Sequence, residues 1–164
     1  MYNFIANTRR MTISSMIIAI YVVTLYITQG FSFGVYQIRI ATALYALAYV
    51  YPFLVVPLGI ANLISNFLFG GLGFLDMFGG CFVGMASAWL IVQIRQHGWN
   101  IWLIVLPIWA VPSLGVSVWL SYLLHIPYSI LVVSLSVGQI ISGICGTFLV
   151  HIIERAYTFH QEGI

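Results

Sequence analysis

The stretch TISSMIIAIYVVTLYITQ, residues 12–29, decides the fold, because all eighteen of its positions are uncharged and most are apolar. A run of this length and composition is typical of a transmembrane helix. Arg9 and Arg10 precede it, as in a secretory or twin-arginine signal. We interpret it as a first membrane span instead, since it is longer than a signal core, no small-x-small cleavage site follows, and five more apolar stretches come behind.

The composition of the whole chain extends this interpretation. Of 164 residues, 62% are hydrophobic and 5% charged, and the mean hydropathy is +1.08, whereas about a quarter of a soluble domain is charged. A helical span needs roughly 20 apolar residues, which leaves room for six or seven spans and no second domain. We predict an all-α integral membrane protein, a compact bundle of six transmembrane helices in a single domain, residues 1–164. The expected spans are 12–29, 35–51, 54–69, 74–95, 101–121 and 128–153.

Prolines and glycines indicate where these helices stop or bend. The second and third stretches are short for a full crossing because Pro52 and Pro57 interrupt the run, so we expect a tight, tilted hairpin there. Pro107 and Pro112 each remove a backbone hydrogen bond inside the fifth stretch, which predicts a kink. Three glycines predict the loop between the third and fourth stretches: Gly70, Gly71 and Gly73.

The arginines predict the orientation, since positive residues near span ends stay on the cytoplasmic side. With six spans and both termini cytoplasmic, Arg39 alone lies outside. The cytoplasmic arginines are then Arg9, Arg10, Arg95 and Arg155. A count of five or seven spans stays open, but it places Arg155 with the exterior.

The charged residues also exclude several functions. A net charge of +2, from five arginines and three acidic residues, is too little to hold nucleic acid. The chain contains no lysine and so cannot form the phosphate-binding loop of an ATPase. We expect no cofactor in this chain, and any use of ATP must belong to partner subunits. No serine lies in a nucleophile elbow, and one exterior carboxylate makes no acid/base pair, so we do not expect an enzyme.

A metal site is not expected either. Cys81 and Cys145 lie far apart in apolar runs, which indicates buried free thiols. The four histidines lack metal-ligand spacing on a helix and are interpreted as interface or solvent residues: His97, His125, His151 and His160.

Two charged residues, Arg39 and Asp76, fall in the exterior half of the predicted bundle. A charge near the hydrocarbon is costly unless it pairs, reaches the interface or lines a wet cavity, which makes both residues candidates for a binding site. The plain alternatives are that Arg39 extends to the lipid headgroups and that Asp76 caps the N-terminus of the fourth helix.

Amides and aromatic rings accompany these charges. Asn62 and Asn66 are four residues apart and therefore share one face of a helix, which should point inward because lipid tolerates amides poorly. They either contact a ligand or hydrogen-bond other helices. We expect a substrate pocket formed by Arg39, Asp76, Asn62, Asn66, Gln37, Tyr36 and Phe74.

Ser15 and Ala19, also four residues apart, form a stripe of small residues on the first span. Such a stripe lets another helix approach closely. It serves either packing inside the bundle or docking of a partner subunit.

Three segments carry a resemblance to a known family: 31–40, FSFGVYQIRI; 57–63, PLGIANL; and 71–76, GLGFLD. Over residues 30–80 the chain resembles the QueT family of queuosine-precursor transporters. The resemblance implies an S component, the substrate-binding subunit of an energy-coupling factor (ECF) transporter, in a prokaryotic cytoplasmic membrane. It implies six spans and an exterior site for 7-cyano- or 7-aminomethyl-7-deazaguanine or queuine. The implied partners are a transmembrane coupling protein and two ATPase subunits.

One position departs from the family pattern. Thr42 stands where the family usually has a glutamate, in the segment Arg39-Ile-Ala-Thr42-Ala-Leu44. If that acid meets the cationic aminomethyl group, its loss favours a neutral ligand such as the 7-cyano form.

Other functions stay open beside this one. The chain could be a solitary secondary carrier or facilitator, or a structural or assembly protein whose polar residues only join helices. A membrane enzyme would need a reactive pair that the sequence does not contain.

Overall fold

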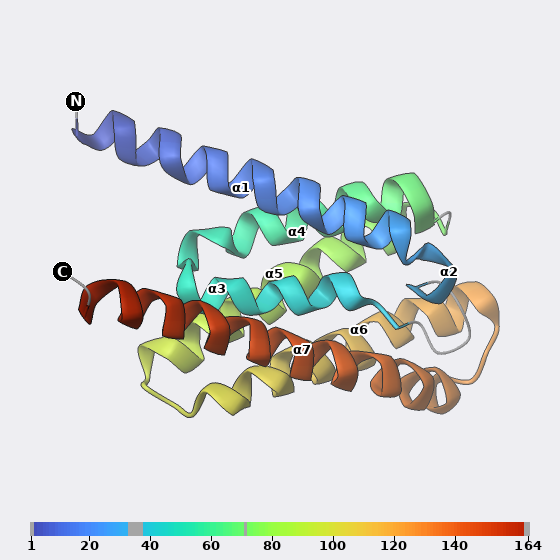
Figure 1. Cartoon of the computed structure of the whole chain (residues 1–164). Coiled ribbons are helices and arrows are strands. Elements are labelled where there is room, and N and C mark those ends of the chain that lie inside the picture. The colour runs from blue at the N-terminus through green and yellow to red at the C-terminus, as the bar shows by residue number, and fades with distance from the viewer. Residues whose placement is uncertain (1, 33–37, 71, 163–164) are drawn as a thin grey trace.

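The computed structural model describes residues 2–32, 38–70 and 72–162, and these residues form six helical passes without a strand (Figure 1). Five of the passes are long and apolar enough to cross a membrane. The prediction of an all-α membrane bundle is therefore confirmed. The first pass is α1 (Tyr2–Ile27) with the short α2 (Gln29–Ser32), and the second is the 3₁₀-helix η1 (Ile40–Ala46) with α3 (Leu47–Val50). The third consists of the 3₁₀-helix η2 (Pro52–Leu54), α4 (Val55–Ser65) and the π-helix η3 (Asn66–Gly70). The fourth is α5 (Phe74–Gln96), the fifth is the 3₁₀-helix η4 (Ile101–Ile104) with α6 (Val105–Leu124), and the sixth is α7 (Tyr128–Glu162).

The second pass is the short central element of the bundle. Its apolar helix runs over Ile40–Val50, which at the rises of 3₁₀- and α-helices is about 20 Å against a hydrocarbon core of about 30 Å. It contacts α1, α5 and α7. Alanines on η1 let these helices come close, and Gly146 of α7 lies where a Cβ would be 2.7 Å from the Ala43 carbonyl oxygen. The short second pass therefore lies inside the bundle.

The expectation that the third pass is also short is wrong. Helical structure runs without interruption from Pro52 to Gly70, 19 residues that suffice for a crossing. Pro52 begins η2, and Pro57 lies in the first turn of α4. Backbone N–H groups in a first turn have no intrahelical acceptor, so a proline there removes no hydrogen bond.

Among the described residues, the other prolines and glycines expected to end or bend helices lie at helix ends, except for Pro112. Pro107 lies in the first turn of α6, whereas Pro112 lies inside the helix, where the expected kink stays a prediction. Gly73 has φ +86° immediately before α5, so the turn there requires a glycine, as expected. Gly70 ends η3, and Gly71 lies outside the described residues.

The ends of the helices are consistent with an even number of passes. Figure 1 shows the start of α1 and the ends of α3, α5 and α7 at one end of the bundle. Arg95, in the last turn of α5, donates from Nη1 to the carbonyl oxygens of Tyr49 and Val50, the latter at 2.8 Å. This arginine therefore holds the end of α3. That this end faces the cytoplasm stays a prediction.

The core lies between α1, η1, α4, α5 and α7, around fully buried side chains such as Tyr21, Tyr45 and Ile91. The helix α1 is peripheral, since only 11% of its span is buried. Both cysteines are free, but Cys145 is exposed and Cys81 partly so. The expectation of buried thiols is thus wrong for Cys145, because the outer surface of a membrane bundle is apolar and accepts such a side chain.

Candidate functional site

A cluster of buried polar side chains occupies the end of the bundle opposite the chain termini, where α4 ends and η1 and α5 begin (Figure 1). Arg39 precedes η1, Asn66 begins η3, and Asp76 lies in the first turn of α5. Their exposed fractions are 6%, 2% and 5%, and Asn62 of α4 is 2% exposed. The fold thus brings together four of the seven expected site residues.

Asn66 joins the charged residues. Arg39 Nη2 donates to Asn66 Oδ1, and Asn66 Nδ2 donates to the backbone carbonyl oxygen of Asp76 at 2.9 Å. Both ends of the amide are used. Since Arg39 is buried and bonded within the bundle, it does not extend to the headgroups.

Asp76 is bonded across the bundle. Its Oδ1 accepts from Trp119 Nε1 of α6 at 3.1 Å. Gly73 precedes the helix without a side-chain cap, and Asp76 is its third residue, where the positive end of α5 stabilises a carboxylate. The carboxylate therefore connects two helices, and Trp119 was not foreseen.

Asn62 belongs to a chain of buried polar groups. Its Nδ2 donates to the Tyr45 hydroxyl at 2.6 Å, and that hydroxyl is 3.2 Å from the Tyr21 hydroxyl. Its Oδ1 is buried and has no hydrogen-bond partner among the described residues; leaving a buried acceptor unsatisfied costs about 1–3 kcal/mol. A Cβ on Gly80 would be 2.9 Å from this oxygen and would collide with the amide of Asn66. Glycine at position 80 therefore makes room for both amides.

The backbone of Arg39 is held from α7. Ser142 Oγ donates to the Arg39 carbonyl oxygen at 2.8 Å, and Thr42 Oγ1 donates to the same oxygen at 2.6 Å. Thr42 Oγ1 also lies 2.9 Å from the side-chain oxygen of Gln139. Because a hydroxyl has one proton, the amide of Gln139 is better placed with its Nε2 donating to Thr42. Gln139 is the one amide in the apolar stretch 128–150, and that was the signal for its role.

One expected site residue, Phe74, lies away from the cluster. Phe74 is 77% exposed, because two residues along a helix correspond to about 200° and the inward position belongs to Asp76. The expectation that Phe74 lines the pocket is therefore wrong. Tyr36 and Gln37 lie outside the described residues.

The small-residue stripe lies on the outside of the bundle. Ser15 and Ala19 are both exposed on α1, so they do not pack between helices of this chain. Of the two interpretations, packing inside the bundle does not hold, and docking of a partner stays a prediction.

The cluster combines hydrogen-bond donors and acceptors in a buried setting. Arg39 offers donors, and Asp76 and Asn62 offer acceptors. Trp119 is hydrogen-bonded to Asp76, and Tyr45 to Asn62. Among the described residues, no three histidine, cysteine, aspartate or glutamate side chains lie close enough to hold a metal ion.

Comparison with known proteins identifies the family. Residues 11–155, most of the chain, match the family model of the QueT transporter. Comparisons with curated proteins and with solved structures found no match. Together with the long apolar helices, this makes the chain a multi-pass membrane protein with a role in transport. The chain therefore belongs to the QueT transporter family, as the resemblance in residues 30–80 predicts.

Proposed function

We propose that the chain is the substrate-binding S component of an ECF transporter that imports a queuosine precursor, a 7-deazaguanine derivative. In this proposal it lies in the cytoplasmic membrane of a prokaryote, with a transmembrane coupling protein and two ATPase subunits as partners. The observation that carries the proposal is the buried cluster of Arg39, Asn66 and Asp76 at one end of the bundle.

The chemistry of this cluster fits a guanine-like edge. Such an edge presents two neighbouring N–H donors and a carbonyl oxygen. Asp76 can accept from the N–H groups and Arg39 can donate to the carbonyl. Asn62 Oδ1, which has no partner in the described part of the chain, can accept a further N–H. Hydrogen bonds to charged groups contribute about 1.5–3 kcal/mol each, so two or three support capture of a scarce ligand.

The first test is thermal unfolding of the purified chain in detergent with excess 7-cyano-7-deazaguanine. A ligand that binds only the folded state at about 100 times its Kd stabilises that state by about 2.7 kcal/mol. We expect the midpoint to rise by several degrees, and guanosine serves as the control. No shift with the 7-cyano form, the 7-aminomethyl form or queuine would contradict the proposed substrate.

A second prediction concerns Thr42, which is 1% exposed and lies beside Arg39. Without a carboxylate at this position, the neutral 7-cyano form should bind more tightly than the cationic 7-aminomethyl form. Thr42→Glu should reduce or reverse the preference for the 7-cyano form. Thr42→Gln, whose side chain has the size of glutamate but no charge, should leave the preference unchanged. Isothermal titration of both ligands measures it, and equal binding of the two forms by the unsubstituted chain would show that Thr42 does not select charge.

A further inference from the structure

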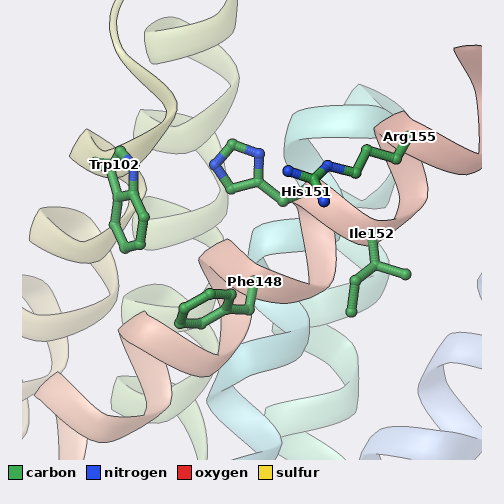
Figure 2. A pocket seen from close by; sticks show the side chains of 5 residues that line it. All are labelled: Trp102, Phe148, His151, Ile152 and Arg155. Atoms are coloured by element: carbon green, nitrogen blue, oxygen red, sulfur yellow. The ribbon is translucent and has the colours of Figure 1, made fainter.

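A groove lies at the end of the bundle that holds the chain termini, far from the polar cluster. It is formed by η4 and by residues 148–155 of α7, and its volume is about 220 Å³. Figure 2 shows its five lining residues: Trp102, Phe148, His151, Ile152 and Arg155.

The lengths of α6 and α7 predict that the groove lies at the level of the membrane surface. The apolar segment of α7, Tyr128–Ala156, has 29 residues and is about 43 Å long at 1.5 Å per residue, so it exceeds the hydrocarbon core of about 30 Å. Arg155 is in the last turn of this segment, and Trp102 is in the first turn of the segment Ile101–Leu124. Tryptophan and arginine are typical of this boundary.

One side of the groove is apolar and open to lipid. Phe148 and Ile152 are 53% and 65% exposed, four residues apart on α7. The rings of Trp102 and Phe148 meet edge to face, with centroids 5.7 Å apart. This pair forms a wall that suits a hydrocarbon chain.

At the other side stands Arg155, the one charged residue among the five that line this largely apolar groove. Figure 2 shows the Arg155 side chain reaching back along α7 toward His151, whose ring centroid is 5.9 Å from that of Trp102. Glu154 is about 100° further round the helix and is not among the lining residues. A guanidinium binds phosphate oxygens through two parallel hydrogen bonds.

We propose that this groove binds an anionic phospholipid, with one acyl chain along Phe148 and Ile152 and the phosphate at Arg155 and His151. Charge and shape together select this ligand. A soluble phosphate would leave the apolar side of the groove without a ligand contact. A zwitterionic lipid, whose headgroup has no net charge, would bind less favourably to Arg155. The proposal is independent of the polar cluster and of its substrate.

The test compares lipid retained by the full chain, using native mass spectrometry from micelles that contain equal phosphatidylglycerol and phosphatidylcholine. The variant is Arg155→Gln. The matched control is Arg9→Gln, which removes another exposed arginine near the start of α1, at the same end of the bundle but outside the groove. We expect the unsubstituted chain and Arg9→Gln to retain phosphatidylglycerol preferentially, and Arg155→Gln to retain at least threefold less.

A second measurement reports the acyl chain. Phosphatidylglycerol with brominated tails quenches nearby tryptophans, and we expect Trp102→Phe to remove a substantial part of the quenching in nanodiscs, while excess glycerol phosphate leaves it unchanged. Equal lipid retention by Arg155→Gln and Arg9→Gln would overturn the proposal. Quenching that Trp102→Phe leaves unchanged would also overturn it, since no acyl chain would then lie beside Trp102.

Discussion

Asp76→Asn is expected to abolish uptake of the proposed substrate, a queuosine precursor, while the protein stays folded in the membrane. Asparagine has nearly the same shape as aspartate and keeps a side-chain oxygen that can accept from Trp119 Nε1. In the unsubstituted chain this nitrogen donates to Asp76 Oδ1 at 3.1 Å. Asparagine lacks the negative charge that attracts the N–H donors of the ligand. Losing one charge-assisted hydrogen bond of about 1.5–3 kcal/mol weakens binding roughly 10- to 150-fold, and the amide N–H₂ adds repulsion against ligand N–H groups.

Arg39→Ala should also abolish uptake, but at a greater cost in stability. It leaves Asn66 Oδ1, which accepts from Arg39 Nη2, without that donor inside the bundle. Uptake of labelled ligand in cells and binding by the purified variants measure the effect, and Arg9→Ala is the control for loss of an exposed arginine. Unchanged uptake in both Asp76→Asn and Arg39→Ala would refute the assigned site. Reduced stability with unchanged ligand binding would favour a purely structural cluster.

The second large effect is expected on α1. Ser15 and Ala19 are exposed there, and α1 is the least buried of the five long apolar helices. If the coupling protein docks on this stripe of small residues, the double variant Ser15→Leu, Ala19→Leu separates the two helices by about the size of a side chain. Energised uptake should then be lost, while 7-cyano-7-deazaguanine still stabilises the purified chain.

Ala86→Leu is the matched control for this variant, because Ala86 is a small exposed residue on another helix, α5. Uptake should survive this substitution. Normal energised uptake by the α1 double variant would place partner docking elsewhere. Uptake that needs no ATPase subunits at all would instead indicate a solitary carrier.

The sequence alone was sufficient for the class of protein. Long uncharged runs such as 12–29 have few stable forms other than a membrane helix, so fold class and family followed from composition and short motifs. The inward position of Asn62 and Asn66 also followed, since their spacing puts both amides on one helix face.

Other features needed the tertiary structure. The length of the third pass depended on where Pro52 and Pro57 fell within their first turns, and element boundaries are the least certain part of a sequence pattern. The outward position of Phe74 followed from the inward position of Asp76. Neither the spacing nor the residue types decide such a rotation.

The partners of the charged residues were likewise decided only by packing. Trp119 and Gln139 are 43 and 97 residues away from Asp76 and Thr42, the residues they contact. Within a helix, the sequence determines neighbours three and four residues apart, because helical geometry is periodic. Contacts between helices depend on which faces meet in the bundle, and the sequence pattern of one helix does not contain that information. The sequence thus determined a membrane transporter with Arg39 and Asp76 in the same half, and the tertiary structure decided which side chains contact these two.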